Sequence, residues 1–270
     1  MKKLIIAILI VTAAVSCGRV VPVNRVIAHR GFWQTEGSAQ NTLASLRLAM
    51  ENGFYGSECD VQLTADSCFI VFHDTNIHGV DVEDMTFEQV LADTTLANGE
   101  RISTVDEFFS TFAGLDGSTK LIIELKQQPS EDMMSLSIAR TAEAVRKYGL
   151  EKRVELISFS YRACKELAAA FPDVPVLFLD RAHNVPFSQM KADGIDGFSY
   201  KYNCVLENLA LIDEAHKAGL IAEVWAPDDP QEVLTMVEAG LDFVITNRPD
   251  VMAAVLEGIR RREHTQPAAR

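Results

Sequence analysis

Several features that mark other classes of protein are missing from this sequence. It has five cysteines in 270 residues, and the four after Cys17 form no C-x-x-C pair and no dense framework, so neither a zinc site nor a disulfide scaffold is indicated. No glycine-rich phosphate loop follows the first predicted strand, which leaves an open nucleotide-binding sheet without support. Lys and Arg number 25 against 38 Asp and Glu, a net charge of -13, which argues against nucleic-acid or anionic-membrane binding through bulk charge.

Long apolar runs are also scarce, and the one at the N-terminus is shorter than the roughly 20 residues that span a bilayer. Residues 1–17, MKKLIIAILIVTAAVSC, place two lysines before a short apolar stretch and small residues before Cys17, the pattern of a secretory signal. The segment resembles a lipoprotein processing site, with Ala14 where a larger aliphatic residue is usual. We therefore predict a bacterial protein, exported and lipid-anchored at Cys17 in the periplasm or cell envelope. An ordinary cleaved signal peptide is the alternative.

Residues 18–24 are predicted to be a tether, and strands and helices alternate after it. The predicted strands are 25–30, 56–60, 120–126, 154–160, 174–180, 195–199, 220–226 and 242–246. Predicted helices separate them, including single helices over 205–218 and 249–261, and such alternation indicates a parallel sheet. Eight units in about 250 residues predict an α/β protein with a TIM-type (β/α)8 barrel. The barrel is expected to form one domain over 25–262, followed by a polar tail, 263–270.

The segment GSECDVQLTADSCFIVFHD, residues 56–74, departs from this alternation and carries two carboxylates close together. Glu58 and Asp60 lie two apart on a predicted strand, so both side chains point to the same face. Folding the segment as a hairpin about Ala65 and Asp66 puts His73 opposite Glu58. The hairpin is predicted to be an excursion after the second barrel strand. Taken alone, the segment also fits a surface hairpin with solvated acids.

The C-terminal ends of barrel strands share one mouth, and the residues with chemical potential gather at such ends. Glu58, Asp60 and Glu124 are oxygen ligands, which suit Ca²⁺ or Mg²⁺ rather than zinc or copper. Two imidazoles supply a base and an acid near neutral pH, and a guanidinium with an ammonium matches phosphate. The set predicts a metal-dependent phosphoryl site, and its remaining members are His29, His73, Arg30, Lys126 and Trp225.

Each of these residues also has a simpler interpretation when it is considered alone. A histidine at a strand end is often structural, Lys126 can pair with Glu124 or Asp60, and Trp225 can belong to the core. Their joint placement at one end of the predicted barrel is what favours an active site.

The chain resembles the glycerophosphodiester phosphodiesterases of the GDPD type, in the PLC-like phosphodiesterase superfamily. The matching motifs occur in the family's order and spacing over nearly the whole mature chain. They are AHRG at 28–31, NT at 41–42, E-x-DVQLT-x-D at 58–66, VFHD at 71–74, RISTVDEFF at 101–109, IELK at 123–126, SF at 158–159, VW at 224–225 and ITNRPD at 245–250.

The resemblance implies a TIM-like barrel that hydrolyses small glycerophosphodiesters to sn-glycerol 3-phosphate and an alcohol. It also implies a role for each candidate residue. One divalent cation, Ca²⁺ or Mg²⁺, would be held by Glu58, Asp60 and Glu124; His29 and His73 would be the acid/base pair; Arg30 and Lys126 would bind phosphate; and Trp225 would line the glycerol pocket.

Two departures from the family pattern flank the predicted mouth. Gln40 stands where the family usually has a glutamate, and the loop from Phe32 to Ala39 is longer and more aromatic than usual. Both put the identity of the substrate in question more than the reaction. Two alternatives therefore stay open: a phospholipase-type phosphodiesterase that acts on lipid head groups, and a lipoprotein that binds a phosphodiester without hydrolysing it.

Overall fold

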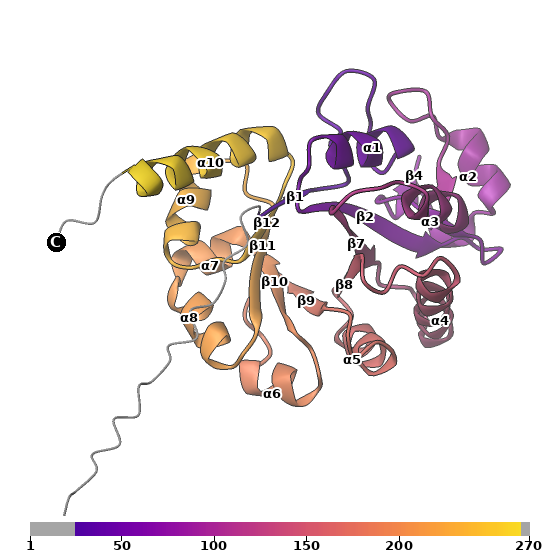
Figure 1. Cartoon of the computed structure of the whole chain (residues 1–270). Coiled ribbons are helices and arrows are strands. Elements are labelled where there is room, and N and C mark those ends of the chain that lie inside the picture. Colours follow the sequence, from indigo (N-terminus) through magenta and orange to yellow (C-terminus); the bar gives the residue numbers. More distant parts are fainter. Residues whose placement is uncertain (1–24, 266–270) are drawn as a thin grey trace, which may run out of the picture.

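The computed structural model describes residues 25–265, and its centre is a closed barrel of eight parallel strands (Figure 1). The strand β1 pairs with both β12 and β2, and these two pairings close the sheet. The predicted TIM-type barrel is confirmed, whereas the predictions for the signal segment, the tether and residues 266–270 lie outside the described residues. The barrel strands are β1 (Val26–Ala28), β2 (Gly56–Leu63), β7 (Lys120–Leu125), β8 (Val154–Ser158), β9 (Val176–Asp180), β10 (Gly197–Lys201), β11 (Ile221–Trp225) and β12 (Phe243–Thr246).

Helices surround the barrel and bury its outer face in one large apolar cluster (Figure 1). Several begin at a Thr or Ser cap; Thr42, for example, accepts a hydrogen bond from the backbone of Ser45 at the start of α1. None of the helices in the described range is both long and apolar enough to cross a membrane. The helices are α1 (Leu43–Glu51), α4 (Glu131–Lys147), α5 (Tyr161–Ala170), α6 (Phe187–Ala192), α7 (Tyr202–Glu207), α8 (Ala210–Lys217), α9 (Pro230–Glu238) and α10 (Pro249–Thr265).

Two helix predictions are corrected by the structure. The single helix expected over 205–218 is two helices, α7 and α8, because Asn208 leaves the helical region with φ -143° and ψ 78°. Asparagine has a low helix propensity. Because the helix is broken there, Val205 on α7 and Ile212 on α8 can both be buried in the core. At the C-terminus, α10 continues to Thr265, past the expected end at 261 and into the predicted polar tail.

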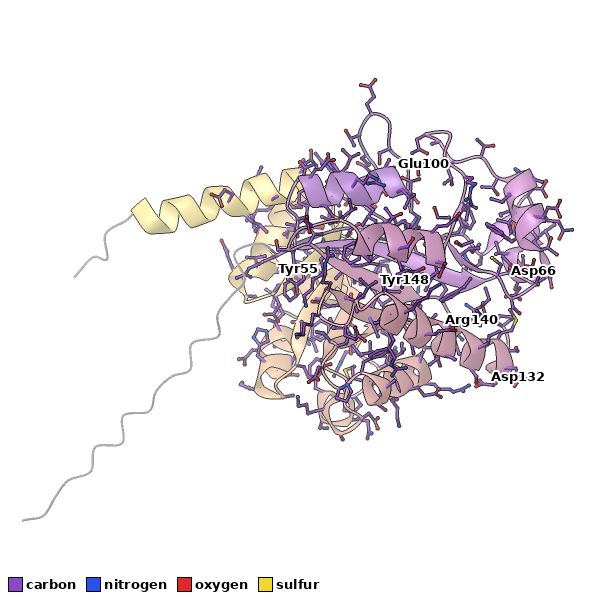
Figure 2. The ribbon with its side chains drawn as sticks, turned by 45° about the vertical axis from the view of Figure 1, so that its right-hand side comes forward. Tyr55, Asp66, Glu100, Asp132, Arg140 and Tyr148 are labelled. Carbon is purple, nitrogen blue, oxygen red and sulfur yellow. The ribbon has the colours of Figure 1, made fainter. Side chains whose placement is uncertain are left out.

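The excursion between β2 and β7 forms a small layer beside the barrel, on the right in Figure 1. Some of its apolar residues make a separate cluster that includes Ile70, Val82 and Ile102, and the rest join the main cluster around the barrel. Glu100 ties this layer to the barrel, because it accepts hydrogen bonds from the first backbone amides of α1, those of Leu43 and Ala44, at 3.1 and 3.2 Å (Figure 2). Its elements are β3 (Phe69–Val71), β4 (Asn76–Ile77), β5 (Val80–Asp81), a 3-10 helix (Val82–Asp84), α2 (Phe87–Asp93), β6 (Ser103–Thr104) and α3 (Val105–Ala113).

The hairpin exists, but its predicted register is wrong by one residue. Val61 lies opposite Val71, so the turn is centred on Asp66, and position 73 does not face position 58. The shift arises because Thr64 still pairs with Cys68 and its hydroxyl bonds Asp66, which adds a residue to the turn. Strand β3 then ends at Val71, and His73 reaches the barrel mouth from an irregular segment.

The barrel interior holds aliphatic and aromatic side chains in its middle, including Ile27, Ile157 and Leu177. Polar groups fill its N-terminal end, where Glu155 accepts hydrogen bonds from Tyr55 and from Lys120, the latter at 2.9 Å. Tyr55 is labelled in Figure 2. Glu223 is fully buried, and its burial, followed by the charge of Glu155, raises its pKa to about 8. Glu223 is therefore neutral at pH 7 inside the barrel.

We expect Glu223 to make stability depend on pH. The unfolded chain releases this proton near pH 4.5 and the folded chain keeps it to about pH 8, so the free energy of unfolding falls as pH rises between these values. Glu223→Gln lacks the titration, and its stability relative to the unsubstituted protein should rise across this window and then level off. Urea denaturation from pH 5 to 9 measures the difference, and a constant difference would contradict the shifted pKa.

Candidate active site

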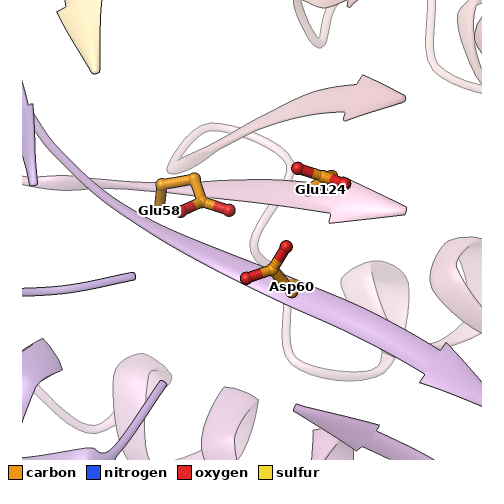
Figure 3. Close-up of side chains that lie close together, drawn as sticks. All are labelled: Glu58, Asp60 and Glu124. Atoms are coloured by element: carbon orange, nitrogen blue, oxygen red, sulfur yellow. The ribbon is translucent and has the colours of Figure 1, made fainter. Parts of the chain in front are cut away.

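Three carboxylates meet at the C-terminal ends of two neighbouring strands. Glu58 and Asp60 come from β2 and Glu124 from β7, and the register pairs Asp60 with Glu124. Figure 3 shows the three carboxylates turned toward one another, and one oxygen from each lies within 4.8 Å of the others. All three residues are buried. Oxygen-only donors at this spacing suit a hard divalent cation.

The crowding of three buried acids raises the pKa of two of them. Burial, then the charges of Asp60 and Glu124, raises the pKa of Glu58 well above its usual range. Burial, then Asp60, raises the pKa of Glu124 to about 7. The Oε1 atom of Glu58 is buried and accepts no hydrogen bond from any residue between 25 and 265. A buried, unpartnered carboxylate oxygen beside two others fits a cation ligand, because a cation supplies the missing partner.

Basic groups on both sides compensate part of this charge. Lys126 lies 3.0 Å from Glu124 and 3.4 Å from Asp60, measured from its Nζ to the carboxylate oxygens. The Nε atom of Arg30 lies 3.8 Å from Asp60. Burial alone would raise the pKa of Asp60, but Lys126, His73, Asn41 and Arg30 outweigh it and lower the pKa. Asp60 is thus the member of the cluster that stays ionised.

The loop after β1 holds Arg30 in a left-handed backbone conformation, with φ 57°. This conformation aims its amide at Glu58 Oε2, 2.7 Å away, and its guanidinium at Gln40 Oε1, 2.6 Å away. The next residue must be glycine, because a Cβ on Gly31 would lie 2.3 Å from the Ser45 hydroxyl. Strain of this kind persists where surrounding contacts fix the backbone, as they do here.

Asn41 positions Asp60 through two reciprocal hydrogen bonds. Its amide nitrogen donates to Asp60 Oδ2 at 2.9 Å, and its Oδ1 accepts from the Asp60 backbone at 3.1 Å. Asn41 also has a left-handed φ of 58°, which asparagine tolerates better than most residues. The loop from 30 to 41 therefore holds two carboxylates in place. The Asn41 side chain holds Asp60, and the Arg30 backbone amide holds Glu58.

His29 is buried at the mouth and oriented by a chain of polar contacts. Asn247 donates to Asp228 at 3.0 Å, so its Oδ1 faces His29 Nδ1 at 2.8 Å and accepts the proton there. The Nε2 atom is left with its lone pair, 4.0 Å from Glu58 Oε2. Burial, then the charge of Arg30, lowers the pKa of His29 to about 4. The imidazole is therefore neutral at pH 7 and suited to accept a proton.

His73 enters the site from the segment after β3. The Gln62 side chain holds this segment by donating to the backbone oxygens of Phe72 and Asp74 at 2.7 and 2.9 Å. His73 Nδ1 bonds Asp74 Oδ1 at 2.8 Å, which leaves Nε2 for a substrate. Burial lowers its pKa, and the Asp60 and Asp74 carboxylates oppose that effect.

One cavity of about 150 Å³ contains most of these groups. Its apolar wall includes Trp225 and Phe159, whose rings meet edge to face at 5.7 Å between centroids. The guanidinium carbon of Arg181 lies 5.8 Å from the Trp225 ring, within cation–π range. An apolar wall opposite a charged floor suits a small polar ligand with a carbon backbone.

Seven of the eight residues singled out in the sequence line this cavity, and the eighth, Asp60, lies beneath it against Lys126. Their individual roles stay predictions. Sequence reasoning assigned no role to several other residues at the site. Asn41, Phe159 and Asn247 fall within the quoted motifs, whereas Arg181 and Asp228 follow barrel strands with no distinguishing local pattern.

The fold and the site define a TIM-barrel protein with carboxylate, imidazole and cationic side chains gathered at its mouth. Residues 29–251 match the model of the glycerophosphoryl diester phosphodiesterase family. The chain belongs to this family, as the sequence resemblance indicated.

Related proteins agree with this assignment. The chain is 27% identical over 241 residues to a glycerophosphodiester phosphodiesterase of Caldanaerobacter subterraneus, covering 84% of this chain and 95% of that protein. A crystal structure of a glycerophosphodiester phosphodiesterase from Parabacteroides distasonis is similar with a TM-score of 0.83 and 33% identity, over 88% of this chain and 98% of that one. An Oleispira antarctica phosphodiesterase in complex with the product sn-glycerol-3-phosphate shares the fold, with a TM-score of 0.72 and 23% identity over 88% and 97% of the two chains.

We expect Glu58→Gln to abolish stabilisation by a divalent cation. A cation that binds only the folded state stabilises it by about 2.7 kcal/mol at one hundred times its Kd. The variant loses a charged ligand, yet its amide oxygen can still accept from the Arg30 backbone. Thermal unfolding in EDTA and in Ca²⁺ or Mg²⁺ measures the shift, with Glu36→Gln, an exposed acid, as the control. No shift in the unsubstituted protein would argue against the cation site.

Proposed function

We propose that this protein hydrolyses glycerophosphodiesters to sn-glycerol 3-phosphate and an alcohol, using a bound divalent cation and two histidines. The observation that carries the proposal is the meeting of three buried carboxylates, two imidazoles and two cationic side chains at one end of the barrel, where all but Asp60 line one cavity. Membership of the family supports the reaction class. The Oleispira antarctica complex supports glycerol 3-phosphate as the product, because that protein shares the fold.

Glu58, Asp60 and Glu124 would hold the cation, either Ca²⁺ or Mg²⁺. When bound, it supplies positive charge to the phosphate oxygens and to the charge that develops on them. Arg30 and Lys126 would bind the phosphate as well, since both side chains line the cavity and both are anchored to the acidic cluster. Phosphoryl transfer needs mainly positioning and electrostatic stabilisation, which these groups provide.

His29 would act as the base and His73 as the acid. Nε2 of His29 takes a proton from the attacking hydroxyl, whose oxygen bonds phosphorus while the bond from phosphorus to the alcohol oxygen breaks. His73 gives its proton to the departing alkoxide, which is a poor leaving group without it. His29 is neutral at pH 7, as a base must be. The Asp74 carboxylate favours the protonated form of His73 against its burial and the charges of Lys126 and Arg30, which lower the pKa of His73. The nucleophile is water, or the glycerol 2-hydroxyl with a cyclic phosphate as first product.

The apolar wall of Trp225 and Phe159 would receive the glycerol carbons. Trp225 is fixed by its indole nitrogen, which donates to the Ser199 backbone at 3.2 Å. Gln40, which departs from the family pattern, still accepts a hydrogen bond from Arg30. The two histidines and three carboxylates weigh against a protein that only binds phosphodiesters.

We expect His29→Ala and His73→Ala each to lower kcat by about 10² to 10⁴, the usual contribution of a general acid or base. Release of glycerol 3-phosphate from glycerophosphocholine and glycerophosphoethanolamine measures activity, in Ca²⁺, Mg²⁺ and EDTA. His183→Ala removes an imidazole outside the cavity and should keep activity. Substantial turnover by either variant with the fold intact would sink the two-histidine mechanism. Release of diacylglycerol, phosphatidate or a lysolipid from vesicles, without release from the small substrates, would instead indicate a phospholipase.

We also propose that the chain is exported and lipidated at Cys17, on the evidence of the N-terminal sequence pattern. Cys17→Ala should move the protein from the detergent phase to the aqueous phase in Triton X-114 partition of bacterial cells. Cys68→Ala, a change to a cysteine in the folded domain, is the matched control and should stay in the detergent phase. Aqueous partition of the unsubstituted protein would contradict the anchor and favour a cleaved signal peptide.

A further inference from the structure

A second cavity, of about 450 Å³, adjoins the active site and takes no part in the mechanism above. We call it the outer cavity. Three segments line it: residues 38–41 before α1, residues 72–74 after β3, and residues 94–97 after α2, together with Trp33. It therefore lies between the long aromatic loop after β1 and the layer inserted between β2 and β7.

His73 lines both cavities. In phosphoryl transfer, the attacking and leaving oxygens lie roughly in line on opposite sides of phosphorus. If His73 protonates the leaving alcohol, the alcohol departs on the side of His73. The outer cavity borders the active site at His73, which lines both cavities, and at Gln40, which lines the outer cavity and accepts a hydrogen bond from Arg30.

The walls of the outer cavity include aromatic rings and one carboxylate, and His73 lies where the cavity borders the active site. Trp33 and Phe72 contribute aromatic rings, and Leu96 adds apolar surface. Asp74 contributes a carboxylate whose side chain is 66% exposed. Among the described residues that line this cavity, none is a lysine or an arginine. Aromatic rings beside a carboxylate are surroundings that bind ammonium groups, and the His73 imidazolium becomes neutral once it gives its proton to the leaving alcohol.

We propose that the outer cavity binds the leaving alcohol of the substrate and selects alcohols that carry an ammonium group, such as choline or ethanolamine. The proposal rests on the proposed function, because it takes the head group of that substrate as the ligand. Trp33 and Phe72 contact the ammonium group, and Asp74 balances its charge. Neutral polyol head groups such as inositol gain neither interaction.

The kinetic test compares two substrates that share glycerol phosphate. We expect kcat/KM to be higher for glycerophosphocholine than for glycerophosphoinositol. Trp33→Leu should lower the ratio of the first kcat/KM to the second by about 2- to 30-fold. Thr95 is an exposed residue at the rim of the outer cavity, so it can be replaced by either charge. Thr95→Lys should lower the ratio by about 2- to 5-fold, and Thr95→Glu should not lower it. Gln34→Ala, on the same loop but outside the lining, keeps the ratio.

A binding test works without turnover. The sequence has two tryptophans, so Trp225→Phe leaves Trp33 as the single indole reporter. Choline chloride should change its fluorescence saturably, whereas myo-inositol, and KCl at equal ionic strength, should not. A linear response equal to that of KCl would overturn the proposal.

The outcomes separate this inference from the proposed function. Hydrolysis of both substrates with a ratio near one, or a ratio that the Trp33 and Thr95 variants leave unchanged, overturns the inference and leaves the reaction standing. A preference for glycerophosphoinositol also overturns it. Hydrolysis of neither substrate, with saturable choline binding, overturns the proposed function and leaves the outer cavity as a site for ammonium compounds.

Discussion

The burial of three carboxylates at the ends of two adjacent strands is the constraint on which the rest of the mouth depends. Like charges in a low-dielectric site repel strongly, and each buried anion loses its hydration. Lys126, Asn41 and the Arg30 backbone are all placed against these oxygens. Arg30 and Asn41 both have left-handed backbone conformations, in which the Arg30 amide and the Asn41 side chain reach the cluster.

The barrel separates this strained end from the part that stabilises the fold. Aliphatic side chains fill the middle of the barrel, and its N-terminal end buries Glu155 in contact with Lys120 and Tyr55. The helices cover the outer face with a continuous apolar cluster. The acidic cluster and the left-handed residues Arg30 and Asn41 lie at the C-terminal end of the barrel, where substitutions in loops can change chemistry without removing the core.

The layer inserted after β2 connects the fold to substrate choice. It delivers His73, which a barrel strand does not carry, and it walls the outer cavity with residues 72–74 and 94–97. The hydrogen bonds from α1 to Glu100 hold this layer against the loop that contains Trp33 and Gln40. Both departures from the family pattern, Gln40 and the loop from Phe32 to Ala39, contribute residues to this cavity, so differences in the alcohol would be read there.

The sequence by itself determined the barrel, the acidic cluster and the residues around it. Alternating strands and helices form a parallel barrel, and the C-terminal ends of parallel strands meet at one mouth. The eight strands, and Glu58, Asp60 and Glu124 at their ends, followed from those rules. The hairpin register did not follow from them, because Thr64 adds one residue to the turn through its hydrogen bonds. The alternation of apolar and polar residues does not indicate these hydrogen bonds. Only the tertiary structure decided that Asp228 orients Asn247 and hence His29, and that Trp33 and Phe72 line one cavity. These relations join segments far apart in the chain, and their geometry exists only once the barrel has closed.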